Sequence, residues 1–314
     1  MKSNINTRYA ILLSQMKIDA EKLSVSLENF IAEYVDKLER DGIILGLSGG
    51  IDSAVVAALC KKAVGSDKVL ALIMPDKDSK KDHVKDAENF AKNINITMRL
   101  IDISPILNKL DVYKLFALNK YPLSSKLKDT LVKKAYNFYE SKTGESPFSA
   151  SILGFKDKDY SSYLKKSNAY YRIKHRIRMV LLYLYGELEN RLVVGAANKS
   201  EYKSGFFVKH GCDDAADIMP LLNLYKTQVR ELSRYLDIPS EIINKAPSPD
   251  IIPGIIDEEA IGITYNQLDL ILLALEKGWS IAELSEFLEV EEEKILYVEK
   301  LIQKSEHMRG AYVP

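Results

Sequence analysis

The chain has 314 residues, enough for one large domain or two small ones. Its 44 Lys and Arg residues equal its 44 Asp and Glu residues, so no overall field favours nucleic acid or a membrane surface. No apolar run approaches the length of a membrane span, and no signal-peptide core follows residues 1–4, so we expect a cytoplasmic protein. The two cysteines, Cys60 and Cys212, predict neither a disulfide framework nor a zinc site.

Strands and helices alternate along most of the chain. Four short apolar runs predict buried strands at residues 43–47, 69–74, 98–102 and 191–195. Helical spacing of apolar residues predicts helices at residues 23–38, from 54 onward, and at 84–94, 171–189 and 226–236. This alternation predicts an α/β fold with a doubly wound, mostly parallel sheet and helices on both faces. We expect residues 1–314 to form a single domain.

Two segments depart from this rhythm. Residues 121–169 are rich in Lys, Ser and Tyr and form either a surface insertion or a lid that sets specificity. Residues 258–305 are expected to be helical, with a capping box from Ser280 to Glu283. Residues 281–290 look like a helix-turn-helix, but the acidic residues at 289 and 291–293 would repel DNA, so we expect no nucleic-acid partner.

The stretch G-I-I-L-G-L-S-G-G-I-D-S, residues 42–53, joins the first predicted strand to a helix. Gly49 and Gly50 let the backbone turn tightly, and the helix N-terminus that follows favours phosphate. Ser48 and Ser53 add hydroxyl donors. A carboxylate repels phosphate, so we interpret Asp52 as a ligand of a magnesium ion that bridges to a polyphosphate. The pattern S-G-G-x-D-S resembles the loop of the N-type ATP pyrophosphatases, which adenylate a substrate and release pyrophosphate.

Four charged residues elsewhere are candidates for the same site. Arg172 and Arg176 lie one helical turn apart and share a face, which could equally be a solvated basic face. Glu201 begins a helix after the fourth strand. It could provide a second carboxylate for a metal near Asp52, or it could simply be a first-turn glutamate that the helix dipole favours. Lys226 could meet a ligand or be an ordinary surface lysine.

Seven stretches in order resemble the ammonia-dependent NAD synthetases, over about residues 23–309 apart from residues 121–169. They are G-L-S-G-G-I-D-S, R-I-K-H-R-I-R-M, V-V-G-A-A-N-K-S-E, G-F-F-V-K-H-G, L-Y-K-T-Q-V-R-E-L, K-A-P-S-P-D and S-E-H-M-R. The resemblance implies an adenine nucleotide alpha hydrolase-like fold and a homodimer. The ATP-binding residues that it implies are Gly46, Leu47, Ser48, Gly49, Gly50, Ile51, Asp52, Ser53, Lys226 and Ser248. The residues that it implies for binding deamido-NAD are Arg176, Lys209, Asp217, His307 and Met308. The magnesium ligands that it implies are Asp52 and Glu201. The catalytic residues that it implies are Asp52 and Lys226.

The implied reaction is the amidation of deamido-NAD to NAD in two steps. The acceptor carboxylate attacks the α-phosphorus of ATP and displaces pyrophosphate, and ammonia then attacks the acyl adenylate to give the amide and AMP. The protein would act mainly by charge stabilisation. We see no glutaminase segment in the chain, so we expect ammonia to be free or to come from a separate partner.

Several residues depart from the family pattern, mostly on the acceptor side. They are Ala196 for Thr, Arg172 for Asn, His175 for Ala, Met308 for Lys, and a loop at residues 210–216 that is one residue longer and lacks two glycines. These changes leave open a relative that amidates another anionic carboxylate, a sulfur transferase using Cys212, and a nucleotide-binding regulator without catalysis. Retention of Asp52, Glu201 and Lys226 argues against the regulator.

Overall fold

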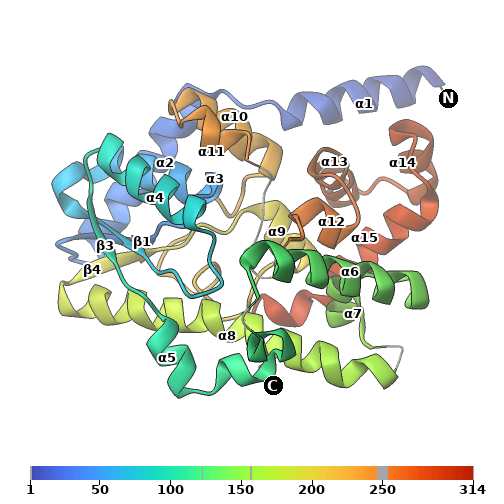
Figure 1. Ribbon diagram of the computed structural model, residues 1–314. Coiled ribbons are helices and arrows are strands. Elements are labelled where there is room, and N and C mark those ends of the chain that lie inside the picture. The colour runs from blue at the N-terminus through green and yellow to red at the C-terminus, as the bar shows by residue number, and fades with distance from the viewer. Residues whose placement is uncertain (1, 122, 156–157, 246–253, 314) are drawn as a thin grey trace.

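The core of the protein is a sheet of four parallel strands in the order β3-β2-β1-β4 (Figure 1). The structure is a computed structural model, and it describes residues 2–121, 123–155, 158–245 and 254–313. The strands are β1 (Gly42–Gly46), β2 (Val69–Ile73), β3 (Thr97–Leu100) and β4 (Arg191–Val194). Ile44 of the central strand β1 lies opposite Leu70 of β2 and Val193 of β4. The predicted parallel α/β sheet is confirmed.

Helices cover both faces because alternate strand residues point to opposite sides. On one face Ile43 and Leu45 pack in a core with the helix before β1, the helices after β1 and β2, and two helices after β4. On the other face Ile44 packs with the long helix that precedes β4. The first group is α2 (Ala20–Lys37), α3 (Ile51–Val64), α4 (Lys81–Asn93), α10 (Lys226–Tyr235) and α11 (Ser240–Ile243); the second is α5 (Ser104–Lys109) and α8 (Lys158–Leu188).

A separate helical core lies beside the sheet, on the right in Figure 1. Tyr265 and Leu268 are fully buried in it, and the N-terminal helix packs on it through Leu12. Its helices are α1 (Lys2–Met16), α9 (Lys199–Ser204), α12 (Asp257–Ile261), α13 (Tyr265–Glu276), α14 (Ile281–Leu288) and α15 (Glu292–Lys304). Helix α9 starts just after β4, so this core is attached directly to the carboxyl edge of the sheet.

The segment at residues 121–169 is mostly helical and lies against this second core. It contains α6 (Ser125–Thr143), α7 (Pro147–Leu153) and the start of α8. The expected start of α8 near residue 171 is wrong: the helix begins at Lys158 and runs for 31 residues, because Leu164 continues the buried side of Tyr171 toward the N-terminus. Ser146 Oγ donates to Ala260 O at 2.9 Å, which ties the segment to α12.

Four single turns complete the fold, η1 (Ser66–Lys68), η2 (Val112–Leu115), η3 (Ala117–Lys120) and η4 (Glu306–Met308). None of the described helices is long and apolar enough to cross a membrane. Since all four strands run in one direction, their carboxyl ends meet at one edge, where open α/β sheets bind ligands. Both β1 and β4 lead into helices at this edge.

Candidate active site

The loop between β1 and α3 is held in a tight turn by its own serines. Ser48 Oγ lies 3.0 Å from Ser53 Oγ and accepts a hydrogen bond from Gly50 N at 3.2 Å. Ser53 Oγ accepts a hydrogen bond from Ser48 N at 3.2 Å. Gly50 caps the 14-residue helix α3 with no side-chain acceptor, so the first amides of the helix stay open to a ligand at its positive end. This arrangement suits a phosphate group.

Gly49 is the position in this loop where a side chain cannot fit. Its φ is +78°, and a Cβ atom there would lie 2.3 Å from His83 O at the start of α4. Gly50, by contrast, has φ of −95°, and a Cβ atom there would meet only Ser48 Oγ, at 3.3 Å. The loop therefore depends on glycine at residue 49 for both its backbone conformation and its close packing on α4.

Lys226 joins the two predicted metal ligands. Its Nζ lies 2.6 Å from Asp52 Oδ2 and 2.8 Å from Glu201 Oε1, and its side chain is 2% exposed. The two carboxylate oxygens are thus at most 5.4 Å apart, the sum of these two distances. A buried lysine at this position is not an ordinary surface lysine.

A third buried carboxylate, that of Asp257, belongs to the same cluster. The Tyr265 hydroxyl lies 2.9 Å from Asp257 Oδ2 and 3.3 Å from Glu201 Oε1. Asp257 Oδ1 is buried and has no hydrogen-bond partner among the described residues. Three carboxyl groups, those of Asp52, Glu201 and Asp257, therefore lie around the single ammonium group of Lys226. Because acids outnumber bases in this cluster, it could also hold a further cation.

The pKa values in the cluster reflect first its burial and then its charges. Burial raises the pKa of Asp257 to about 6, and Lys226 only partly opposes this. Burial also raises the pKa of Glu201, again against the attraction of Lys226. Burial by itself lowers the pKa of Lys226, but Asp52 and Glu201 outweigh burial and hold it above the ordinary lysine value. Lys226 therefore stays charged, while Glu201 and Asp257 bind protons more readily than free carboxylates do.

Supporting groups that the sequence analysis missed hold these side chains in place. Asn198 Nδ2 donates to Asp52 Oδ1 at 2.9 Å, and Asn198 Oδ1 caps α9 by accepting from Glu201 N at 3.0 Å. The buried Asp269 accepts from Thr227 N at 2.9 Å and from Ser200 Oγ, which in turn accepts from Lys226 N. Asn198 could have been predicted as a helix cap from the sequence, because Asn is favoured at that position. The contacts made by Asp257 of α12 and Asp269 of α13 depend on residues distant in the sequence, so no local pattern predicts them.

A cavity of about 210 Å³ opens over the loop and the carboxylates. Lys245 forms one wall, donating to Gly49 O at 3.0 Å and pairing with Asp86. The cavity collects nearly all the residues predicted to bind ATP or metal: Gly46, Leu47, Ser48, Gly49, Gly50, Ile51, Asp52, Ser53, Glu201 and Lys226. Ser248 lies outside the described residues.

The predicted acceptor residues are only partly brought together. Arg176 Nε donates to Lys209 O at 3.2 Å, and Lys209 Nζ donates to His307 O at 2.6 Å. Met308 is buried in the helical core. Asp217 is not among the residues that line the first cavity; its carboxylate accepts from the Val193 amide at 2.9 Å and from the Tyr183 hydroxyl at 3.3 Å. Roles for these five residues stay predictions.

A second cavity, of about 400 Å³, lies under the segment at residues 121–169. Its walls are rich in aromatic rings, from α6, α7 and α8 and from the loops at Phe116 and Phe206: Phe116, Tyr136, Phe138, Tyr139, Phe148, Tyr160, Tyr163, Tyr171, Phe206 and Phe207. Phe206 lines both cavities, so they are neighbours. Arg172 also lines the second cavity; burial and then the nearby Arg176 lower the pKa of its guanidinium. The Arg172 guanidinium donates to Ser151 Oγ at 3.3 Å, and among the described residues no carboxylate pairs with it.

Comparison with known proteins shows which family the chain resembles over most of its length. The NAD synthase family matches residues 23–121 and 121–311. The chain belongs to the NAD synthase family.

Individual relatives agree with this family. The NH(3)-dependent NAD(+) synthetase of Thermotoga maritima is 41% identical over 284 residues, 90% of this chain and 95% of the relative. That of Methanocaldococcus jannaschii is 37% identical and is matched over 92% of this chain and 94% of its own length. Among solved structures, NMN synthetase from Francisella tularensis is 28% identical with a TM-score of 0.69, over 95% of this chain and 99% of that one. The resemblance seen in the sequence motifs is confirmed.

The loop between β1 and α3 of this NAD synthase family member, which we call the phosphate loop for its expected role (residues 47–50), provides a matched pair of glycine substitutions. We expect Gly49→Ala to lower the free energy of unfolding by at least about 1–2 kcal/mol, the cost of a left-handed alanine, with more from the contact with His83 O. Gly50→Ala should cost less, because its φ is ordinary and its one close neighbour is a hydroxyl. Urea unfolding of the two variants measures the difference. Equal costs at both positions would contradict this account of the loop.

Proposed function

We propose that this protein is an ammonia-dependent NAD synthetase, a ligase that forms a C–N bond. It uses ATP to adenylate the carboxylate of deamido-NAD, and ammonia then displaces AMP to give NAD. The observation that supports this most directly is the single cavity in which the phosphate loop meets Asp52, Glu201 and Lys226. Such a cavity can bind ATP phosphates and stabilise the charge that develops when pyrophosphate leaves.

The donor set of this cavity fits magnesium. Asp52, Glu201 and Asp257 supply only oxygen ligands, which hard divalent cations prefer, and Asp257 Oδ1 is a buried acceptor with no donor in the described part of the chain. Asp52 and Glu201 would hold the ion, with Asp257 behind them. When bound, magnesium would draw charge from the polyphosphate. The amides of α3 would bind phosphate oxygens, and Lys226 would place a positive charge beside the leaving pyrophosphate.

The second cavity is the best candidate for the nicotinate end of the acceptor. Deamido-NAD brings a flat aromatic ring that carries a carboxylate. The cavity offers aromatic walls and the guanidinium of Arg172, which has no described carboxylate partner. Phe206 lies at the boundary with the first cavity, so a ligand bound across it can reach both. On this view the segment at residues 121–169 is a specificity element.

The reaction itself tests the proposal. Purified protein with ATP, magnesium, ammonium and deamido-NAD should release NAD, AMP and pyrophosphate, and glutamine in place of ammonium should not support turnover. Asp52→Asn and Glu201→Gln should each reduce kcat/KM by roughly 100-fold or more, since each removes charge from the metal site. Asp67→Asn, on an exposed turn, is the matched control and should leave kcat/KM unchanged.

Two results would contradict the proposal. One is pyrophosphate release at wild-type rates in both site variants. The other is amidation of the mononucleotide counterpart of deamido-NAD in preference to the dinucleotide, the outcome that the similarity to an NMN synthetase makes worth measuring. The nitrogen source in the cell, whether free ammonia or a separate supplying partner, and the cytoplasmic location stay predictions.

Arg172 gives a sharper test of the acceptor cavity. Arg172→Met keeps the length of the side chain but removes its charge, so we expect the KM for deamido-NAD to rise roughly 10–100-fold, the equivalent of one charged hydrogen bond. The KM for ATP should not change, because Arg172 does not line the first cavity. Lys133→Met, which breaks an exposed ion pair with Glu259 on the same segment, is the control. An unchanged KM for deamido-NAD in Arg172→Met would remove Arg172 from the acceptor site.

The outer side of α8 supports the proposed homodimer. Val180, Leu184 and Leu188 are 52%, 46% and 69% exposed and recur every four residues, so they form one apolar stripe. We expect light scattering to give the mass of two chains at micromolar concentration, and Leu184→Glu to shift the protein toward one chain. Leu38→Glu, at an exposed leucine after α2, should not. A wild-type protein that is monomeric and active would contradict the homodimer.

A further inference from the structure

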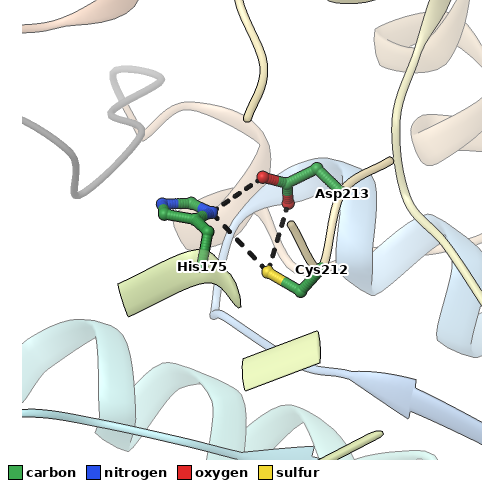
Figure 2. Close-up of side chains that lie close together, drawn as sticks. All are labelled: His175, Cys212 and Asp213. Atoms are coloured by element: carbon green, nitrogen blue, oxygen red, sulfur yellow. Dashed lines mark hydrogen bonds and ion pairs between the residues drawn. The ribbon is translucent and has the colours of Figure 1, made fainter. Parts of the chain in front are cut away.

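One wall of the first cavity carries three side chains of kinds that bind metal ions (Figure 2). His175 projects from α8, and Cys212 and Asp213 project from the loop that follows Gly211. His175 Nδ1 lies 2.8 Å from Asp213 Oδ2 and 3.6 Å from Cys212 Sγ, and Cys212 Sγ lies 3.7 Å from Asp213 Oδ1. The sequence analysis expected no zinc site because only two cysteines are present, but it could not see that these three side chains meet.

We propose that His175, Cys212 and Asp213 form a binding site for a divalent zinc-like cation, separate from the magnesium site at Asp52 and Glu201. The spacing supports this. Ligand bonds of ordinary zinc length at tetrahedral angles place nitrogen, sulfur and oxygen atoms about 3.3–3.6 Å apart. The two distances that involve sulfur are 3.6 and 3.7 Å. The shorter Nδ1–Oδ2 contact is a hydrogen bond, which a cation would replace by widening it about half an ångström.

The backbone brings these ligands together by a close approach. A Cβ atom on Gly211 would lie 2.9 Å from Val208 O and 3.0 Å from the Cβ of His175, so only glycine lets the loop come this near to α8. Cys212 N then donates to His175 O at 3.1 Å. His175 and the Cys212-Asp213 pair are also places where the sequence departs from the family pattern, and the structure shows that these departures touch.

The geometry does not suit the other use of such residues, a thiol activated for nucleophilic attack. In a relay the cysteine and the acid bind opposite nitrogens of the imidazole. Here both face Nδ1, while His175 Nε2 is buried without a hydrogen-bond partner among the described residues. Burial, reinforced by Asp213, also raises the pKa of the Cys212 thiol, so the free thiolate needed for attack is disfavoured.

Metal binding would balance charge at this position. The cation displaces the thiol proton of Cys212, which goes to solvent, and the thiolate and the carboxylate of Asp213 together neutralise a dication. Against the effect of burial, the positive charge of Arg178 acts to lower the pKa of both Cys212 and Asp213. With these two groups neutralised by the cation, the site together with Arg178 would carry a net positive charge. Because all three ligands line the first cavity, the fourth coordination position opens to it and favours water or an anionic oxygen. Occupancy would clamp the loop after Lys209 to α8.

Cobalt(II) titration tests the site without relying on catalysis. Cobalt in a tetrahedral site with a thiolate ligand gives a sulfur-to-metal charge-transfer band in the near ultraviolet, whereas an oxygen-only site does not. In excess magnesium, the full chain should take up one equivalent of cobalt with this band, and zinc should displace it. Cys212→Ser should abolish the band, and Cys60→Ala, at the one other cysteine, should keep it.

His175→Ala serves as the second variant, and circular dichroism checks that each variant is folded. Loss of a residue that only hydrogen-bonds to a metal ligand lowers metal affinity by roughly 10–100-fold. Because His175 is itself a proposed ligand, we expect His175→Ala to lower the affinity for cobalt by more than this. The proposal is overturned by a wild-type chain that shows no charge-transfer band, by a band that persists in Cys212→Ser, or by affinity that His175→Ala leaves unchanged. None of these outcomes depends on whether the chain makes NAD.

Discussion

The buried ammonium group of Lys226 is the constraint on which the rest of the structure depends. Its carboxylate partners come from separate elements, Asp52 from α3 and Glu201 from α9, while Lys226 itself starts α10. Tyr265 on α13 extends the contacts to the helical core. Breaking a buried ion pair by removing one partner typically costs about 3–5 kcal/mol. If the sheet and the helical core separated, the ammonium group of Lys226 would be exposed to solvent or left buried without its carboxylate partners.

This constraint also fixes the position of the phosphate loop. Asp52 lies in the first turn of α3, directly after Gly49 and Gly50, so holding its carboxylate holds the turn. Asn198 reaches from the end of β4 to the other oxygen of Asp52. The loop is thus tied at its helical end to β4 and α10, and at Gly49 to α4 and Lys245. A preorganised loop binds phosphate with little further loss of conformational entropy.

The sequence predicted the parts of this arrangement that depend on local pattern. Strands such as residues 43–47 were readable because a buried parallel strand is a continuous apolar run. The same patterns could not decide whether Lys226 was buried, since that depends on partners 174 and 25 residues away in the chain. Asp257 was missed for the same reason. The start of α8 was misplaced because residues 158–170 are polar on their solvent side. Their buried side faces the rest of the segment at residues 121–169, which none of the seven family-like stretches covers.

The charges of the two cavities suit the proposed reaction between anions. ATP and the acceptor carboxylate repel each other, and two unit charges 4 Å apart interact by about 4 kcal/mol at an effective dielectric constant of 20. In the proposed reaction that repulsion would be offset from both sides. Lys226 and a cation held by the carboxylates would face the nucleotide, while Arg172 would face the acceptor. The carboxylates Asp52, Glu201 and Asp257 line the first cavity, where they would hold a cation, and the second cavity has the guanidinium of Arg172 without a described carboxylate partner. In the proposed reaction, a first cavity that pairs its acids with Lys226 and a second cavity that holds Arg172 would let one protein hold two anions close enough to react.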